Sequence, residues 1–223
     1  MTNPWLALPT TAPYVLPAEH NKIERFNHAY PEPDYRIRLN VLPEPYIGNP
    51  QAKVVILSLN PGYDETDPDW HARPDFRSSL VANLRHEPQP YPFYPLNPAY
   101  SGSGIHKWWR SKLNDLIRDT SLPTIAHNVL CVEWFPYHSI KYKAIPKGIS
   151  GGLLPSQTYA ISLVTAAVDR GATLIAMRRY QDWAQQVPGL RAYDKVHHLR
   201  SPQSGHLSSN NLINYPGIVK ALS

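Results

Sequence analysis

The fold of this chain is decided by the stretch Val54-Val55-Ile56-Leu57-Ser58-Leu59-Asn60-Pro61-Gly62-Tyr63. Its first part is a short apolar run rich in β-branched residues, which is typical of a strand buried on both faces of a sheet. The run ends at Asn60-Pro61-Gly62, where proline and glycine turn the backbone out of the strand. Open α/β sheets bind ligands at this carboxyl edge, so Asn60 is the first candidate for chemistry. On this segment alone a plain turn is the simpler interpretation, because Asn-Pro and Pro-Gly are common in turns.

The composition indicates one folded, basic domain. A chain of 223 residues with 42% hydrophobic residues is long and apolar enough to bury a core. The 24 prolines against 11 glycines predict long, ordered loops instead of flexible linkers. A formal charge of +5 and a pI near 9.2 are compatible with a polyanionic partner such as DNA, although basic charge alone is a weak signal.

Cysteine usage and hydropathy exclude several protein classes. Cys131 is the only cysteine, which excludes an intramolecular disulfide framework and an iron–sulfur cluster held by four cysteines of this chain. The N-terminus does not resemble a signal peptide, and no apolar run is long enough to span a bilayer. The sequence therefore predicts a cytoplasmic protein without a membrane partner, and we expect a monomer.

Strand and helix signals alternate along the rest of the chain. Residues 1–50 are rich in proline and aromatics and are expected to wrap over the surface of a single domain spanning 1–223, with one helix at Glu19–Tyr30. Three further strands are predicted at Asn128–Phe135, Ala172–Met177 and Val196–Leu199. Helices are predicted at Ser79–His86, Ile105–Asp119, Ser156–Arg170, Tyr180–Gln186 and Tyr215–Leu222. This alternation predicts a three-layer α/β/α sandwich with a central, mainly parallel four-stranded sheet.

Two segments of the first half leave alternatives open. The run Pro88–Pro95 is either the wall or lid of a pocket, in which Phe93 and Tyr94 stack on a ring, or a rigid surface loop. In the helix predicted at Ile105–Asp119, an apolar stripe is formed by Trp108, Leu113, Leu116 and Ile117. The basic residues Lys107, Arg110 and Lys112 fall outside this stripe and are interpreted as solvated.

Several common chemistries have no motif here. No glycine loop ending in Gly-Lys-Ser/Thr is present, and Gly102-x-Gly104 lacks the third glycine of a dinucleotide site. The ten histidines show no His-Glu-x-x-His or His/Cys spacing of a metal site, and a single cysteine cannot supply the pair of a zinc deaminase. The sequence predicts neither a cofactor nor a metal.

Four segments, taken in order, resemble the uracil-DNA glycosylase superfamily. They are the strand ending in Leu59-Asn60-Pro61-Gly62, the strand ending in Glu133-Trp134-Phe135, the segment Thr173–Met177 with the following helix that carries Trp183, and the late loop Ser201-Pro202-Gln203-Ser204. The resemblance covers about residues 50–220, and Asn60-Pro61-Gly62 is similar to the form of the mismatch-specific branch. It implies base flipping and hydrolysis of an N-glycosidic bond in DNA.

The resemblance implies roles for the first and last motifs. Asn60 would orient the attacking water, which suffices if the base leaves early from an oxocarbenium-like sugar. Ser201, Gln203 and Ser204, with Arg200, would enter the minor groove or hold phosphates. The histidine that often begins this loop in the family falls at Leu199, which cannot assist the leaving group. The mismatch-specific branch also lacks this histidine.

Glu133 is the second departure from the family pattern. In uracil-specific members an asparagine at this place binds the pyrimidine edge, whereas a carboxylate accepts hydrogen bonds and suits an amino group such as cytosine N4. The resemblance therefore suggests a modified cytosine as the excised base, in keeping with relatives that act in antiviral defence. The alternative is that Glu133 forms an ion pair with Lys141, Arg178 or Arg179 and meets no base.

The sequence thus predicts a DNA glycosylase with Asn60 as its catalytic residue. Tyr63, Trp134, Phe135 and Tyr94 are candidates for the ring-stacking wall of the base pocket, with Glu133 on the base edge and His138 beside it. The DNA-binding set would join Lys141, Lys143 and Lys147 to the late loop. Two alternatives remain, namely a nucleic-acid-binding module of the same fold without catalysis and a hydrolase of free nucleosides.

Overall fold

A computed structural model describes residues 1–223 and has an α/β fold built on one sheet of five strands. The order across the sheet is β1-β3-β2-β4-β5, with bounds β1 (Tyr46–Gly48), β2 (Val54–Leu57), β3 (Val129–Val132), β4 (Thr173–Ala176) and β5 (Val196–His198). Strands β2 to β5 are parallel, which confirms the four predicted strands. The predicted strand count was wrong by one, because β1 adds an antiparallel edge strand beside β3.

Side chains of alternate residues enter two separate cores on the two faces of the sheet. Val55 and Leu57 of β2 belong to one buried cluster, whereas Val54 and Ile56 belong to the other. The same alternation continues in β3, where Leu130 lies in the first cluster. All four residues of β2 are fully buried, as its position at the middle of the sheet requires.

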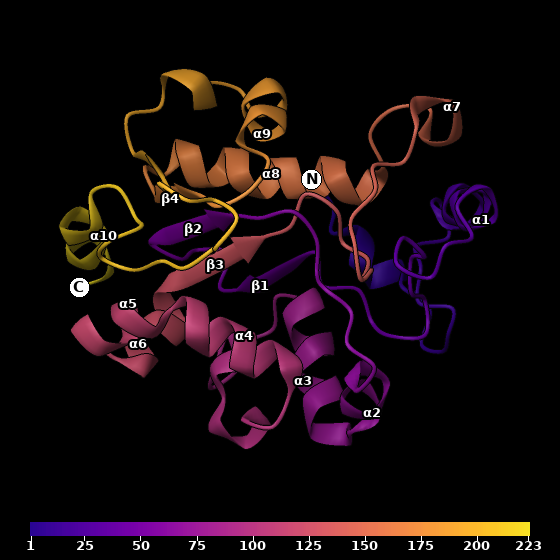
Figure 1. Ribbon diagram of the computed structural model, residues 1–223, viewed down its shortest axis with the longest axis horizontal. Helices are drawn as coiled ribbons and strands as arrows, with labels where there is room; N and C mark the ends of the chain where they lie inside the picture. The colour runs from indigo at the N-terminus through magenta and orange to yellow at the C-terminus, as the bar shows by residue number, and fades with distance from the viewer.

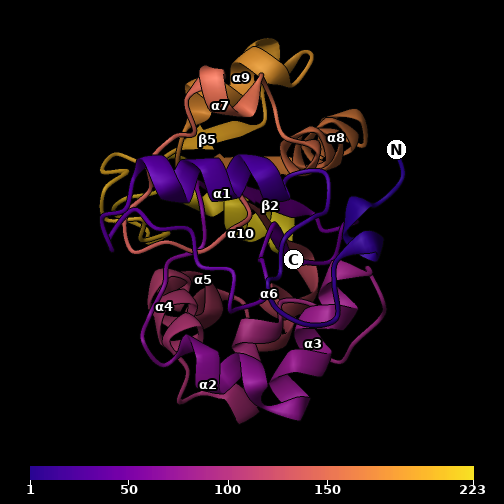
Figure 2. The same cartoon turned by 90° about the vertical axis from the view of Figure 1, so that its right-hand side faces the viewer.

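Helices lie on both faces of the sheet (Figures 1 and 2). One group of helices lies on the side of the first cluster and comprises α1 (His20–Ala29), α7 (Lys147–Ser150), α8 (Pro155–Asp169) and α9 (Tyr180–Gln186). The second group comprises α2 (Asp67–Ala72), α3 (Pro74–Leu84), α4 (Gly104–Lys112), α5 (Asn114–Asp119), α6 (Leu122–Asn128) and α10 (Tyr215–Leu222). None of these helices has both the length and the apolar character that crossing a membrane demands.

The single helix predicted at Ile105–Asp119 is two helices, α4 and α5. The chain leaves helical geometry at Leu113, where φ is −98° and ψ is 4°. Trp109 and Leu113 are buried against the second core, whereas Trp108 is 41% exposed. The predicted apolar stripe was therefore wrong about Trp108. Because the chain leaves helical geometry at Leu113, the buried faces of α4 and α5 do not form one continuous stripe, and Trp109 is the buried tryptophan of α4.

The N-terminal segment contributes more to the fold than a surface wrap. Trp5, Phe26 and Tyr46 are buried in the first core. Strand β1 is fixed on its outer edge by the Asn83 side chain, which accepts from the Gly48 N–H and donates to the Tyr46 carbonyl, at 3.1 and 2.7 Å. Gly48 has φ of +117°, and a Cβ there would overlap the Val129 carbonyl, so only glycine fits.

Candidate functional site

A pocket of about 410 Å³ lies at the carboxyl ends of three neighbouring strands. Residues 58–63 follow β2, Glu133 follows β3, and Met177 and Arg178 follow β4. The chain passes from β2 to β3 on one side and then to β4 on the other side of β2. This is the switch point of the parallel sheet, where α/β folds place their ligands. The volume is in the range of pockets that enclose small organic molecules.

Asn60 lies in this pocket with a fixed amide orientation. Its Nδ2 donates to the Pro61 carbonyl at 2.9 Å and to Ser139 Oγ at 3.1 Å. Because a carbonyl oxygen only accepts, this contact assigns the nitrogen to that side of the amide. No protein group donates to Oδ1, which leaves that oxygen as an acceptor for a molecule in the pocket. Asn60 can therefore orient a water without acting as a base.

Glu133 shares the pocket and has an unusual environment for a carboxylate. Its side chain is 5% exposed, and its Oε2 has no hydrogen-bond partner within the protein. Its Oε1 lies 3.7 Å from the Cys131 thiol. Burial raises the pKa of Glu133 to about 7, against the opposing effects of the nearby Ser58 hydroxyl, the Cys131 thiol, the Leu59 backbone N–H and the charge of Arg178. An unpartnered buried oxygen at a pocket wall favours a ligand that supplies the missing bond.

The predicted ion pair of Glu133 is not formed. Lys141 lies 2.7 Å from Asp34, and Arg179 is bonded to Asp182 at 2.7 Å. Arg178 stands at the pocket wall and donates through Nη2 to the Gln203 carbonyl at 3.0 Å. Arg178 influences Glu133 only through its charge and makes no hydrogen bond to Glu133 Oε2. It connects the pocket wall to the late loop through Gln203.

His138 and Glu44 both line the pocket. The ring of His138 meets two carbonyl oxygens, Nδ1 with Gly62 at 2.6 Å and Nε2 with Leu42 at 3.1 Å. Both partners are acceptors, so these contacts hold the ring between two carbonyl groups of the chain. Glu44 Oε1 lies 4.0 Å from Nε2 and accepts from the Tyr94 hydroxyl at 2.8 Å. This pair fixes the loop that carries Asn60 through the Gly62 carbonyl.

Burial is the main influence on Glu44, whose pKa rises to about 7. The positive charge of His138 and the hydrogen bond from Tyr94 oppose this rise. The nearby ring of His71 has a pKa well below its ordinary value, first because it is buried and then because His138 repels a second positive charge.

Glu44, His71 and His138, which we name the Glu44 cluster, have the composition of a metal site. Their ligand atoms lie within 4.8 Å of one another. However, His71 Nδ1 accepts from the Leu42 N–H at 3.0 Å, which leaves the proton of the neutral ring on Nε2. Both nitrogens of His138 are also bonded to carbonyls. A cation would have to displace these bonds, so the donor set fits a hydrogen-bonded network better than a metal centre.

Two aromatic side chains flank the mouth of the pocket. Tyr63 follows the Asn60 loop, and the guanidinium of Arg38 lies 4.8 Å from its ring centroid. Trp108 belongs to α4 and, unlike its neighbour Trp109, is exposed. Of the predicted base-pocket residues, Tyr63, Glu133 and His138 are therefore brought together with Asn60.

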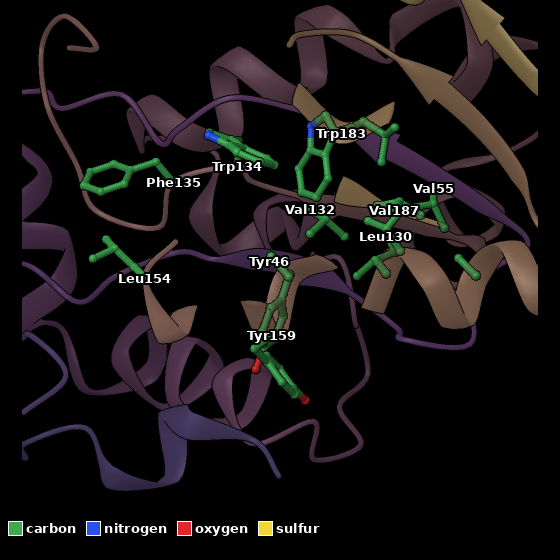
Figure 3. Close-up of a cluster of buried hydrophobic side chains, with 14 of the residues drawn as sticks. Tyr46, Val55, Leu130, Val132, Trp134, Phe135, Leu154, Tyr159, Trp183 and Val187 are labelled. Atoms are coloured by element: carbon green, nitrogen blue, oxygen red, sulfur yellow. The ribbon is translucent and has the colours of Figure 1, made fainter. Parts of the chain in front are cut away.

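Other predicted base-pocket residues lie elsewhere. Trp134 and Phe135 belong to the buried hydrophobic cluster on the α8 side, as Figure 3 shows, and Trp134 packs edge-on against Trp183 at 5.0 Å. Trp134 follows Leu130 and Val132 in the two-residue period of β3, so it points to the face opposite Glu133. Tyr94 is fully buried behind the pocket, where it contacts Glu44 instead of a ligand.

The run Pro88–Pro95 supplies no residue to the pocket wall. Phe93 is fully buried and packs edge-on against Trp109, with the two ring centroids 4.9 Å apart. The lid alternative is therefore wrong, and the rigid-surface-loop alternative fits only the start of the run, because Phe93, Tyr94 and Pro95 are buried.

The predicted DNA-binding residues fall into two separated groups. The late loop is ordered by its own bonds, since the Asn211 amide donates to Ser204 Oγ at 3.0 Å and to the His206 carbonyl at 2.7 Å. Arg200, Ser201 and Gln203 of this loop are exposed. Lys141 is neutralised by Asp34, Lys143 lies over the rings of Tyr30 and Tyr35, and Lys147 begins α7. In Figure 1, α7 lies at the upper right, away from the yellow chain that leads to α10 on the left and contains the late loop.

Glu44, His71 and Trp108 were not predicted as site residues. Glu44 lies between prolines in a segment interpreted as a surface wrap, and His71 belongs to α2, which was not predicted. A usable signal existed for Trp108, because Trp108 and Trp109 are adjacent on one helix and cannot both face the core.

Comparison with known proteins yields no relative: no protein-family model, no curated protein and no solved structure matches this chain.

Proposed function

We propose that this protein is a DNA glycosylase with the three-layer α/β/α fold of the uracil-DNA glycosylase superfamily. In this proposal it extrudes one nucleotide into the pocket beside Asn60 and hydrolyses its N-glycosidic bond. One observation carries the proposal: the free Oδ1 of Asn60 and the unpartnered Oε2 of Glu133 line the same pocket at the switch point of the sheet. Asn60 Oδ1 can hold the attacking water, and Glu133 can bind the edge of the extruded base.

In the proposed step, the bond between C1′ and the base nitrogen breaks and the base keeps the electron pair. A water held by Asn60 Oδ1 then forms the new bond to C1′ and gives its proton to solvent. The base takes up a proton after it leaves, so the products are a free base and an abasic strand. The guanidinium of Arg178, at the pocket wall, favours the negative charge that develops on the base.

Glu133 would determine which base is accepted. As a carboxylate, it accepts from an exocyclic amino group such as cytosine N4 and repels the O4 carbonyl of uracil or thymine. As a neutral acid, it both donates and accepts, and so it can pair with either edge. Because its pKa is about 7, we expect the preference for amino-bearing bases to increase as the pH rises through neutrality. A modified cytosine in phage DNA is the substrate that we propose, with antiviral defence as the setting.

The test is a glycosylase assay on oligonucleotides that carry uracil, mismatched thymine, cytosine, hydroxymethylcytosine or glucosylated hydroxymethylcytosine. Alkaline strand cleavage reports abasic sites, and Asn60→Ala is compared with wild type on each substrate. Release of one amino-bearing base that Asn60→Ala abolishes would support the proposal. Salt-sensitive DNA binding without any abasic site would contradict it and favour a binding module. Hydrolysis of free nucleosides alone would contradict the assignment of DNA as substrate.

A further inference from the structure

A second, strongly basic depression lies beside the pocket. It has a volume of about 740 Å³, and all ten residues that line it are polar or charged. Its positive and titratable members are His106, Lys107, Arg110 and Lys112 from α4 and His206 from the segment after the late loop. We refer to these five residues as the basic hollow.

The basic side chains of the hollow form no salt bridge within the protein, although Lys107 lies near enough to Asp64 to help lower the pKa of that carboxyl. Lys107, Arg110 and Lys112 take part in none of the salt bridges of the fold. Asp115, the one acidic residue in the depression, is bonded to Arg118 at 3.2 Å and accepts from the Ser209 N–H at 3.1 Å. Unpaired cations in an open depression favour an anionic ligand.

Basic side chains of the hollow and of the pocket lie close to one another. Lys112 Nζ donates to the Ser204 carbonyl at 2.7 Å, and Arg178 Nη2 donates to the adjacent Gln203 carbonyl. Gly205 lies between these cations, since a Cβ there would lie 3.5 Å from Arg178 Nη2 and 3.8 Å from Lys112 Cε. Burial and the charge of Arg178 both lower the pKa of Lys112, as expected for neighbouring cations. A positively charged path therefore runs from the hollow to the pocket wall.

Trp108 stands between the two depressions. It lines the pocket, it is 41% exposed, and the Lys112 ammonium lies 5.6 Å from its ring centroid. An exposed aromatic ring flanked by cations is the combination with which proteins bind single nucleic-acid strands, because bases stack on the ring while cations contact phosphates.

We propose that the basic hollow and Trp108 bind the segment of the DNA strand next to the extruded nucleotide. Trp108 stacks on the neighbouring base, and the side chains of the basic hollow contact the phosphates of that segment. This inference rests on the proposed function and names the surface by which the substrate strand is held. It also reverses the interpretation of Lys107 and Arg110 as merely solvated residues.

The test is binding of a fluorescein-labelled single-stranded oligonucleotide of ordinary bases, followed by anisotropy over a range of salt concentrations. Lys107→Gln/Arg110→Gln removes two charges from the hollow, and Lys112 is kept because it supports the late loop. The matched control is Lys53→Gln/Lys195→Gln. It removes two exposed charges that directly precede β2 and β5, at the amino ends of the strands, whereas the pocket lies at their carboxyl ends. We expect about tenfold weaker binding for the first variant and a salt slope reduced by about 0.7 for each lost phosphate contact. The control should bind as wild type does.

A second measurement addresses Trp108. Binding should quench part of the intrinsic tryptophan fluorescence, and this quenching should be lost in Trp108→Leu. Equal weakening by both double variants, or unchanged quenching in Trp108→Leu, would overturn the inference. Neither measurement depends on cleavage, so the two proposals fail separately. Wild-type-like binding of Lys107→Gln/Arg110→Gln by a protein that releases a base contradicts only this surface. Strong, hollow-dependent binding without base release contradicts only the glycosylase.

Discussion

The substitution Glu133→Gln should change how the stability of the protein depends on pH. Burial raises the pKa of Glu133 from an ordinary 4.5 to about 7. In that interval the folded protein keeps a proton that the unfolded chain releases. The stabilising contribution of the protonated group is therefore complete below about pH 4.5 and is lost as the pH rises through about 7. The shift corresponds to about 3 kcal/mol of unfolding free energy, since one pKa unit is about 1.4 kcal/mol.

Glutamine has nearly the same shape and does not ionise, so the variant loses this pH dependence. We expect the difference in unfolding free energy between Glu133→Gln and wild type to shift by about 3 kcal/mol in favour of the variant between pH 4.5 and about pH 8. Urea denaturation at several pH values measures it, and comparing two pH values removes the constant effect of the substitution. Glu44 is present in both proteins, but the charge of Glu133 raises the pKa of Glu44, so losing that charge also favours the variant at high pH.

Glu32→Gln is the control, because Glu32 is exposed and makes no side-chain hydrogen bond, and its profile should follow that of wild type. Parallel profiles for Glu133→Gln and wild type would refute the reasoning. They would mean that the Glu133 carboxylate is solvated through the pocket and carries no desolvation cost.

Three further predictions concern the surroundings of the pocket. Tyr94→Phe should destabilise the fold by about 2 kcal/mol in urea denaturation, because the buried Glu44 carboxylate loses its hydroxyl donor; an unchanged midpoint would contradict this network. Gly48→Ala should cost at least about 3 kcal/mol, measured in the same way, because the new methyl group overlaps the Val129 carbonyl and the positive φ disfavours alanine; near-neutral stability would show that β1 can shift. Treatment with a strong chelator should leave the melting temperature and the activity unchanged, because hydrogen bonds occupy the Glu44 cluster; a lower melting temperature would indicate a bound metal.

The parallel part of the fold could be predicted because each strand is a short apolar run closed by a marked turn. Val54–Leu57 before Asn60-Pro61-Gly62 is the clearest case. Strand β1 could not be predicted in the same way, since Tyr46–Gly48 is three residues long and shows no periodicity. Its pairing with β3 and the bonds from Asn83 hold it in place, and these long-range contacts leave no local signal.

The candidate site was predictable where it follows directly from a strand end. Asn60 and Glu133 meet because parallel strands end at one edge. The placement of Trp134 could also have been predicted, because it has the phase of Val132 and so faces the other core. Glu44 and His71 come from irregular segments that only the tertiary fold brings to the pocket. The unpaired state of Lys107 and Arg110 depends on where every carboxylate lies, which no single stretch reveals.

The most direct test of the central claim is single-turnover base release, followed by mass spectrometry of the free base and the abasic strand. It compares wild type, Asn60→Ala and Glu133→Gln on an amino-bearing and a carbonyl-bearing base. We predict that Asn60→Ala slows release of either base by about 10² to 10⁴-fold. Glu133→Gln should instead change the ratio of the two rates. Release that survives in Asn60→Ala, or a ratio unchanged in Glu133→Gln, would contradict the roles assigned to these two side chains. No release by wild type would contradict the glycosylase itself.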